Sequence, residues 1–275
     1  MAPRHGFRFN SKLISLDAST IDLCLEVFPW ARFRRTKSAM KLHAGLNHDG
    51  YLPEFVKITD GKTSDITAAR SFTFPKRSIT VCDQGYNDYA WYSQLNSQDV
   101  FFVSRQKSNA KYRIVERREV NKQRGLSSDQ TIEFTGVQTR KKCPIPIRRI
   151  GYRCAETGRR YLFLINNFTL AANTIAQIYT SRWQVELFFK WVKQNLKIKR
   201  FVGTTRNAVM TQIWIAMCAY LLIVFIKFQS KVGKSMQQIL WLFQLNLFEK
   251  RELFGFLRGD PPIDKDTYSK QGVFW

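Results

Sequence analysis

The chain has 275 residues, 44% of them hydrophobic, and a formal net charge of +23 from 44 Lys and Arg against 21 Asp and Glu. This length allows one large core or a core with a subdomain, and the charge favours a polyanionic partner: nucleic acid first, then an anionic membrane, then a ribosome-like assembly. Five cysteines without a Cys-x-x-Cys pair argue against a zinc site or a disulfide framework and fit a reducing cytoplasm.

The first part of the chain predicts strands followed by a short helix. A short apolar strand ends at Asp17, and residues 30–40 form a basic loop. Residues 41–59 predict a hairpin, because two β-rich runs surround a turn sequence. Ser64 or Asp65 then caps a helix.

The middle of the chain repeats the opening pattern and then changes character. Residues 79–82 predict a β-branched strand, which Asp83 follows directly. Residues 89–95 predict a helix and 99–105 another strand. From about 107 to 160, charged β-prone pieces alternate with turns, which predicts an inserted, strand-rich subdomain.

The last part of the chain predicts a core strand and then helices. The strand is at 161–168, and the helices are at 171–195, 207–229, 234–247 and 249–259, with a tail at 260–275. The longest unbroken apolar run, 213–226, has 14 residues. A bilayer needs about 20, so we interpret the run as a buried core helix, with a membrane-surface anchor as the alternative.

Four polar residues share one side of the helix expected at 171–195. At about 100° per residue, Tyr179, Arg182, Glu186 and Lys193 fall within an arc of about 60°, beside a wide apolar face. One interpretation is a salt-bridged helix edge, since Arg182 precedes Glu186 by four residues and such a pair contributes only a few tenths of a kcal/mol.

The other interpretation is a metal site. If the strands that end at Asp17 and before Asp83 are neighbours, both carboxylates emerge at one edge of a sheet, where a packed helix could add Glu186. Three converging carboxylates repel one another, and hard divalent cations such as Mg²⁺ relieve that repulsion. Two ions about 3.5–4 Å apart can hold the attacking and leaving oxygens of a phosphoryl transfer.

The cations near these carboxylates then have a function as DNA contacts. Arg182 and Lys193 would hold flanking phosphates, and Tyr179 could hydrogen-bond or stack there. Arg34 and Arg35 belong to a charge run shortly after the first aspartate, so they are candidates for phosphate contact or for a solvated loop.

The three motifs together resemble a known family. The pattern Tyr-x2-Arg-x3-Glu-x6-Lys that starts at residue 179 resembles the signature of bacterial insertion-sequence DDE transposases of the hairpin-forming, cut-and-paste kind. LDAST around Asp17 and VCDQGYNDY around Asp83 resemble their first and second aspartate motifs, in the same order.

This resemblance implies a fold and a domain organisation. The fold is α/β, with a ribonuclease-H-like catalytic core, a β-strand-rich insertion and C-terminal helices. The catalytic domain would cover residues 12–250, with 107–160 as the insertion, and 251–275 would form a short helix and a tail.

The resemblance also implies a Mg²⁺-dependent transposase that is both nuclease and strand transferase. Asp17, Asp83 and Glu186 would be the catalytic residues and would bind two Mg²⁺ ions, for which Mn²⁺ could substitute. Such an enzyme cuts the element's end, forms a hairpin and joins a 3′-hydroxyl to target DNA without a covalent intermediate, so Tyr179 is not a nucleophile. The expected partners are double-stranded DNA, at transposon ends and target, and a second copy in the DNA complex. No membrane is expected, and the location is the cytoplasm, at the nucleoid.

Two departures from the family pattern leave alternatives open. Gln84 stands where the second motif usually has Arg, which removes a phosphate-binding cation. Only 16 residues precede Asp17, whereas family members carry a DNA-end-binding domain there, so we expect a shortened transposase. The alternatives are an inactive DNA-binding remnant and a structure-selective nuclease on the same fold.

Overall fold

The computed structural model describes residues 5–196, 198, 200–246 and 252–260. The strands are β1 (Leu13–Leu23), β2 (Arg32–Arg34), β3 (Lys37–Asn47), β4 (Leu52–Asp60), β5 (Ile79–Cys82), β6 (Phe101–Arg105), β7 (Tyr112–Arg118), β8 (Leu126–Phe134), β9 (Ile147–Arg153) and β10 (Arg160–Ile165). The helices are α1 (Asp65–Ala69), α2 (Tyr89–Ser97), α3 (Val137–Lys142), α4 (Ala172–Ser181), α5 (Trp183–Asn195), α6 (Arg206–Ser230), α7 (Met236–Leu245) and α8 (Leu253–Arg258).

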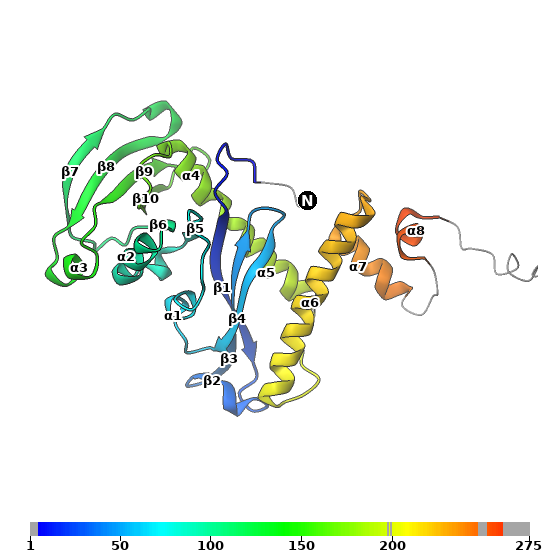
Figure 1. Cartoon of the computed structure of the whole chain (residues 1–275). Helices are drawn as coiled ribbons and strands as arrows, with labels where there is room; N and C mark the ends of the chain where they lie inside the picture. Colours follow the sequence, from blue (N-terminus) through cyan, green and yellow to red (C-terminus); the bar gives the residue numbers. More distant parts are fainter. Residues whose placement is uncertain (1–4, 197, 199, 247–251, 261–275) are drawn as a thin grey trace, which may run out of the picture.

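All ten strands belong to one mixed sheet (Figure 1). Their order is β2-β3-β1-β5-β6-β10-β9-β8-β7, and β4 also pairs with β3. Strand β1 is antiparallel to β3 and parallel to β5, which is in turn parallel to β6. The four residues of β5 are all buried, as expected for a central parallel strand that is covered on both faces. Strand β7, at the edge, is largely exposed and rich in charge, which discourages pairing with other chains.

The two faces of the sheet have separate cores, because alternate residues of a strand point to opposite sides. On one face, Ile14 and Phe102 pack with residues of α2. On the other face, Leu13 and Ile79 pack with residues of α4. Helices α5 and α6 continue the cover of this second face over β1 and β3.

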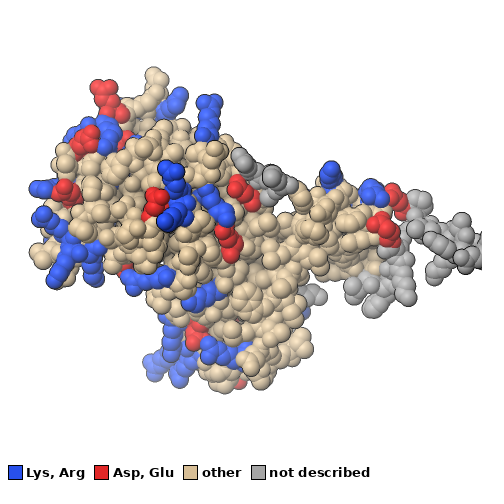
Figure 2. All heavy atoms as spheres, viewed as in Figure 1, with Lys and Arg blue, Asp and Glu red and all other residues tan. Residues whose placement is uncertain are grey.

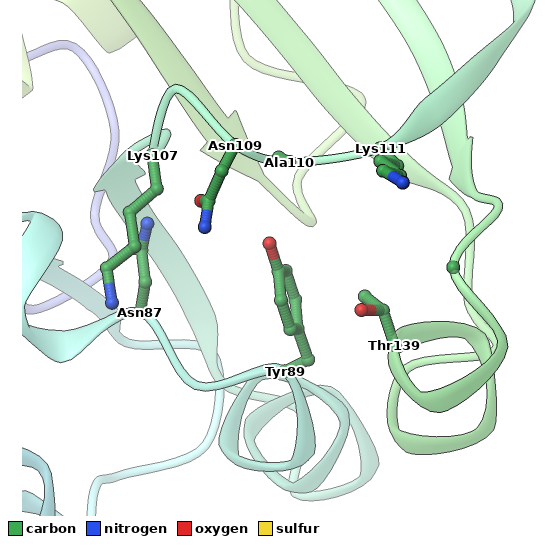
Figure 3. Close-up of a pocket in the computed structure, with 8 residues that line it drawn as sticks. Asn87, Tyr89, Lys107, Asn109, Ala110, Lys111 and Thr139 are labelled. Atoms are coloured by element: carbon green, nitrogen blue, oxygen red, sulfur yellow. The ribbon is translucent and has the colours of Figure 1, made fainter.

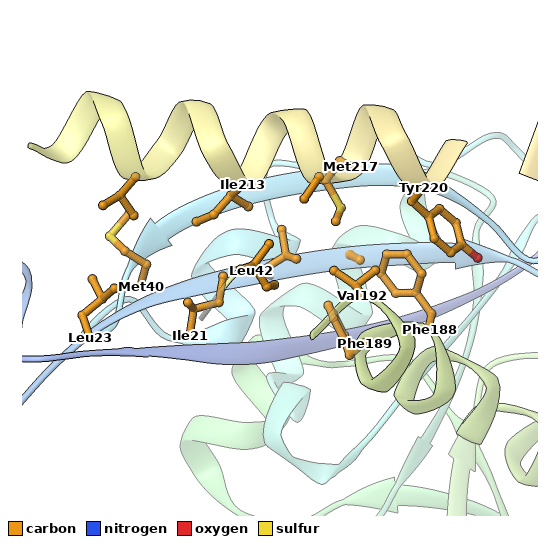
Figure 4. Packing of buried hydrophobic residues seen from close by; sticks show 14 of the residues in the cluster. Ile21, Leu23, Met40, Leu42, Phe188, Phe189, Val192, Ile213, Met217 and Tyr220 are labelled. Atoms are coloured by element: carbon orange, nitrogen blue, oxygen red, sulfur yellow. The ribbon is translucent and has the colours of Figure 1, made fainter. Parts of the chain in front are cut away.

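Helix α6 lies along the sheet and is held by one of its sides. Figure 4 shows Ile213, Met217 and Tyr220 of α6 directed towards the strands, next to Val192 and Phe188 of α5. All five residues are buried in one cluster. The expected core helix at 213–226 therefore packs into a core on this side.

The argument from length that we applied to this helix is wrong. The helix has 25 residues, and its most apolar 18-residue window has a mean hydropathy of 2.2, so it is long and apolar enough to cross a membrane by length and composition. Only 39% of that window is buried, and Ile215, Leu222 and Phe225 are exposed. The expectation that the protein has no membrane contact stays a prediction.

Two further local expectations need correction. Residues 30–40 are not a loop: β2 turns directly into β3, and Arg34 pairs with Lys37. The helix expected at 171–195 is present but is interrupted at Arg182, between α4 and α5. There the Arg182 amide donates to the Tyr179 carbonyl at 3.2 Å, an i to i−3 bond that tightens the turn.

The segment at 107–160 forms β7, β8 and β9 and also a short helix, α3, which the sequence did not indicate. Its strands extend the main sheet, because β9 pairs with β10 and β10 pairs with β6. The boundaries of this insertion and of the 12–250 domain stay predictions. Of the expected C-terminal part at 251–275, α8 is present, and residues 261–275 lie outside the described residues.

Candidate active site

The two motif aspartates lie side by side in the sheet. Leu13 pairs with Ile79 and Ser15 with Val81, and the same register continued places Asp17 next to Asp83. Asp17 is an even number of residues from Leu13, so it points to the same face as Leu13, the face that α4 and α5 cover. Asp83 is likewise an even number of residues from Ile79, so it points to this face too.

The position of Asp17 within its strand differs from the expectation. The strand does not end at Asp17 but continues to Leu23, because β3 pairs with it over the whole length, with Asp17 opposite Ala44. Only the parallel pairing with β5 stops, at Ser15. Asp83 follows β5 directly, as expected, and its carboxylate accepts the Gly85 amide at 2.7 Å.

Helix α5 brings Glu186 to the aspartates through Arg182. The Arg182 guanidinium lies 3.3 Å from the Asp17 carboxylate and 2.6 Å from that of Glu186. The side chains of Arg182, Asp17 and Glu186 are 15%, 23% and 46% exposed, so Glu186 is the most exposed of the three. The pair of Arg182 and Glu186 expected for a salt-bridged edge exists, and it is joined to the first aspartate.

The charge at this site is unbalanced. The pKa of Asp17 is raised from 3.8 to about 6: burial is the largest cause, and the negative charges of Asp83 and Glu186 also raise it, whereas the Ala18 amide and Arg182 lower it. One guanidinium thus contacts two carboxylates, and a third, Asp83, is close enough to raise the pKa of Asp17. The Nε atom of Arg182 is buried and has no hydrogen-bond partner.

The donor chemistry of the site fits hard divalent cations, since the three groups are carboxylates and each charge disfavours ionisation of Asp17. Within the residues that the structure describes, no three His, Cys, Asp or Glu side chains are grouped closely enough to hold a metal ion as they stand. Arg182 occupies the position between Asp17 and Glu186.

Tyr179, Arg182, Glu186 and Lys193, the four polar residues on one side of the helices, are called the polar stripe. Its other two members, Tyr179 and Lys193, differ in their surroundings. Tyr179 packs on Phe163, with ring centroids 4.6 Å apart, and Arg182 lies over its ring at 5.9 Å. Burial raises the pKa of the Tyr179 hydroxyl. Lys193 is half-buried in the last turn of α5, about 10 Å along the helix from Glu186.

Comparison with known proteins agrees with this arrangement. Residues 8–222 match the family model described as the transposase DDE domain. The chain belongs to the DDE transposase domain family. It is 31% identical over 242 residues to a putative transposase, y4zB, of Sinorhizobium fredii, which covers 86% of this chain and 66% of that protein.

Two further relatives are similar to this DDE domain. A probable transposase for insertion sequence element IS5377 of Geobacillus stearothermophilus is 31% identical over 83% of the chain and 60% of its own length. A putative transposase for insertion sequence element IS4SA of Synechocystis is 24% identical over 90% of the chain and 70% of its own length. The chain thus spans less than two thirds of the first two relatives. The expected mixed α/β, ribonuclease-H-like fold class is confirmed.

The DDE domain does not bring Arg34 and Arg35 to the carboxylates. Arg32 and Leu23 both pair with Ser38, so β2 lies at the far end of β1. Six residues separate Asp17 from Leu23, about 20 Å along a strand. The cavity that Arg35 lines also contains Asp22 and Glu26, which balance its charge.

Sequence reasoning missed a second group of cations beside the aspartates. Cys82 pairs with Ser104, and the same register places Arg105, the last residue of β6, next to Asp83. The signal was available, because Arg105 ends a strand that was itself expected. Figure 2 shows Lys and Arg gathered over the region of β7, β8 and α3 and around β2, with few over α6.

It also missed a buried ion pair in the β7–β9 region. Arg148 and Asp129, each 5% exposed, form two bonds of 2.9 and 2.6 Å. Arg148 also donates to the carbonyls of Asn167 and Leu170, at 3.3 and 2.6 Å. The pair ties β8 and β9 to the segment that leads into α4. No sequence spacing indicates it, because the partners come from different strands.

Proposed function

We propose that this chain is the catalytic domain of an insertion-sequence transposase, which cleaves and joins DNA by phosphoryl transfer with divalent metal ions. The observation that supports this most is the shared face of Asp17 and Asp83, side by side in the sheet under the helix that carries Glu186. Family membership supports the reaction class, and the unbalanced charge supports a cation at this place.

In this proposal Asp17, Asp83 and Glu186 hold Mg²⁺, or Mn²⁺ in its place. When bound, the metal ions supply an activated water or 3′-hydroxyl and stabilise charge on the leaving oxygen. The carboxylates must be ionised for this, so Asp17 has to lose its proton, which its raised pKa delays to about pH 6. Arg182 is then free to leave the carboxylates and hold a phosphate of the cut strand.

The other members of the stripe position the DNA. Lys193 lies further along α5 and contacts a flanking phosphate, while Tyr179, packed on Phe163, supports Arg182 through its ring. The spacing of these residues relative to Glu186 supports the hairpin-forming kind of transposase. A pair of chains on the DNA, double-stranded ends and targets as substrates, and a cytoplasmic location at the nucleoid all stay predictions.

The experiment that tests the function uses the full chain, a supercoiled plasmid and a labelled duplex that ends in a free 3′-hydroxyl. With Mg²⁺ or Mn²⁺ we expect plasmid nicking and covalent joining of the label to the plasmid, and with Ca²⁺ neither. Nicking without joining would identify a nuclease, and binding without either would identify an inactive remnant.

The hairpin step has its own readout. A flanked element end from the gene's neighbourhood, incubated with the protein and Mg²⁺, should yield a strand of double length on a denaturing gel. Release of two ordinary ends without that product would contradict the hairpin-forming mechanism while leaving the transposase function intact.

A further inference from the structure

A cavity of about 460 Å³ opens directly beside the second aspartate. We call it the basic pocket. The residues that define it come from the turn after β5, the end of β6, the loop that follows and strands β9 and β10: Gln84, Arg105, Lys107, Tyr112, Arg149 and Arg160. Gln84 follows Asp83 in the chain, so the pocket adjoins the proposed catalytic site.

The charge of the basic pocket has one sign. Four of its lining residues are cations and no carboxylate lines it. Across the described part of the chain, none of these four cations takes part in an ion pair, whereas Arg113, Arg118 and Arg148 on the neighbouring strands do. Like charges that share a cavity repel one another, and a bound anion relieves that repulsion.

The cations are held in place by neutral groups. The Nε atom of Arg149 donates to Gln106 at 2.7 Å and its Nη1 atom to Gln130 at 2.9 Å, and its guanidinium lies over Tyr112 at 4.9 Å. Arg105 lies over the ring of Tyr161 at 5.4 Å. Amide oxygens and rings orient a guanidinium without cancelling its charge, and they leave donors free for a ligand.

The loop of the pocket carries further cations past its rim. Lys107 also lines a second cavity, of about 300 Å³, on the other side of the loop. Figure 3 shows Lys107 beside Asn87 and Asn109 near Tyr89, with Lys111 further along the same loop. No carboxylate lines this cavity either. A chain of phosphates could therefore follow the loop.

We propose that the basic pocket binds a backbone phosphodiester of the DNA strand that passes Asp83, and that Arg105 supplies the cation that Gln84 does not. This inference rests on the proposed function. The register that places Arg105 next to Asp83 puts a guanidinium at the same edge of the sheet as residue 84. The charge of Arg105 also acts on Tyr179 of α4. Burial raises the pKa of the Tyr179 hydroxyl, and Arg105 is one of the cations that lower it.

The test measures DNA binding in EDTA, so that it does not depend on catalysis. The full chain is titrated into a labelled 20-base single strand and a 20-base-pair duplex, at several salt concentrations. Arg105→Ala should weaken binding about tenfold and lower the salt slope by about one unit. Lys227→Ala is the control, since Lys227 is also an exposed cation without a carboxylate partner among the described residues, but it lies in the last turn of α6 and has no proposed DNA contact.

Rescue separates the pocket from a general charge effect. Gln84→Arg in the Arg105→Ala background should restore most of the lost affinity, whereas Leu222→Lys, which adds a charge on the exposed side of α6, should not. Equal losses for Arg105→Ala and Lys227→Ala would overturn the pocket, and failure of rescue would overturn the role given to Arg105. If Arg105→Ala does not fold, Arg160→Ala serves in its place.

Two further results identify the ligand of the basic pocket and separate this inference from the proposed function. One millimolar ATP should not displace the oligonucleotide; full displacement would mean that the pocket takes a free nucleotide and would overturn the DNA assignment. If the pocket variants behave as expected but the wild-type chain neither nicks nor joins DNA with Mg²⁺, the proposed function fails and the phosphate site stands.

Discussion

The protein contains two arginine–carboxylate sites with opposite designs. Arg148 and Asp129 are both 5% exposed, form a two-bond pair, and the remaining donors of Arg148 reach backbone carbonyls. Arg182 instead joins two carboxylates that are 23% and 46% exposed, near a third, and its Nε atom has no partner. The first site is saturated and serves the fold. The second has an excess of carboxylates and a donor without a partner, so a ligand can bind there.

The difference shows that residue types alone do not distinguish a structural site from a functional one. Both sites contain an aspartate from a β-strand that pairs with arginine: Asp17 with Arg182, and Asp129 with Arg148 and, at 3.5 Å, with Arg118. What separates them is the balance of charge and the number of hydrogen-bonding groups without partners. A cation added at Arg182's site would lower the repulsion among carboxylates, while none is needed at Arg148's.

The largest expected effect is on catalysis at the incomplete site of Asp17, Arg182 and Glu186, which we call the open site. Asp17→Asn, Asp83→Asn and Glu186→Gln should each lower Mg²⁺-dependent nicking and joining about a thousandfold or more, because each removes a proposed metal ligand and the metal contributes several kcal/mol. DNA affinity in EDTA should stay within about twofold. Glu133→Gln, a carboxylate paired with Arg113 on the β7–β9 region, is the control and should keep full activity. Near-normal nicking by Glu186→Gln would contradict the assignment.

The saturated site of Arg148 and Asp129, which we call the closed site, should contribute more than the open site to the free energy of unfolding. Asp129→Asn leaves the Arg148 charge buried without its partner, so it should lower the free energy of unfolding by about 3–5 kcal/mol in urea titrations. Arg182→Met should cost less, about 1 kcal/mol, since solvent screens its partly exposed partners, even though the carboxylates that remain repel one another more. Equal costs at the two sites would remove the distinction between them.

The open site should also show itself in the dependence of stability on pH. The folded-state pKa of Asp17 is about 6 and its ordinary value is 3.8. Between these values the folded protein holds the proton that the unfolded chain has released, so this group's contribution falls as pH rises from about 4 to 6. Asp17→Asn should therefore gain roughly 2–3 kcal/mol relative to the wild type at pH 7.5, and nothing at pH 3.5.

Urea titrations of both proteins at the two pH values measure this difference. Addition of Mg²⁺ at pH 7.5 should stabilise the wild type and leave Asp17→Asn unchanged, since only the wild type has the complete carboxylate set. A stability difference that is independent of pH would mean that folding does not raise the pKa of Asp17.

The smallest expected effect is on DNA affinity next to the open site. Lys193→Ala should lower the slope of log affinity against log salt by about one unit, because one phosphate contact is lost. Lys227→Ala is a matched control, since Lys227 also lies in the last turn of a helix but at the far end of α6. The same slope change in both variants would show that Lys193 acts only through the overall charge.

Much of the fold follows from local patterns. The strand at Ile79–Cys82, the hairpin of β3 and β4 and the helix capped by Ser64 are all present as expected. These elements are decided by residues close together in the chain: a β-branched run, a turn sequence and a capping hydroxyl. Some failures were at ends, where β3 keeps pairing with β1 beyond Asp17 and where Arg182 interrupts a helix. Others were whole elements: β2 lies where a loop was expected, and α3 was not expected.

The sequence by itself indicated the three carboxylates that we propose as catalytic, because three motifs with their spacing are local and ordered along the chain. It did not determine which cations stand beside them. In the tertiary structure Arg105 lies next to Asp83, and Arg34 and Arg35 lie at the far end of β1. Asp129 forms an ion pair with Arg148. The physical reason is that charge acts through distance and burial, and both depend on strand register between segments far apart in sequence.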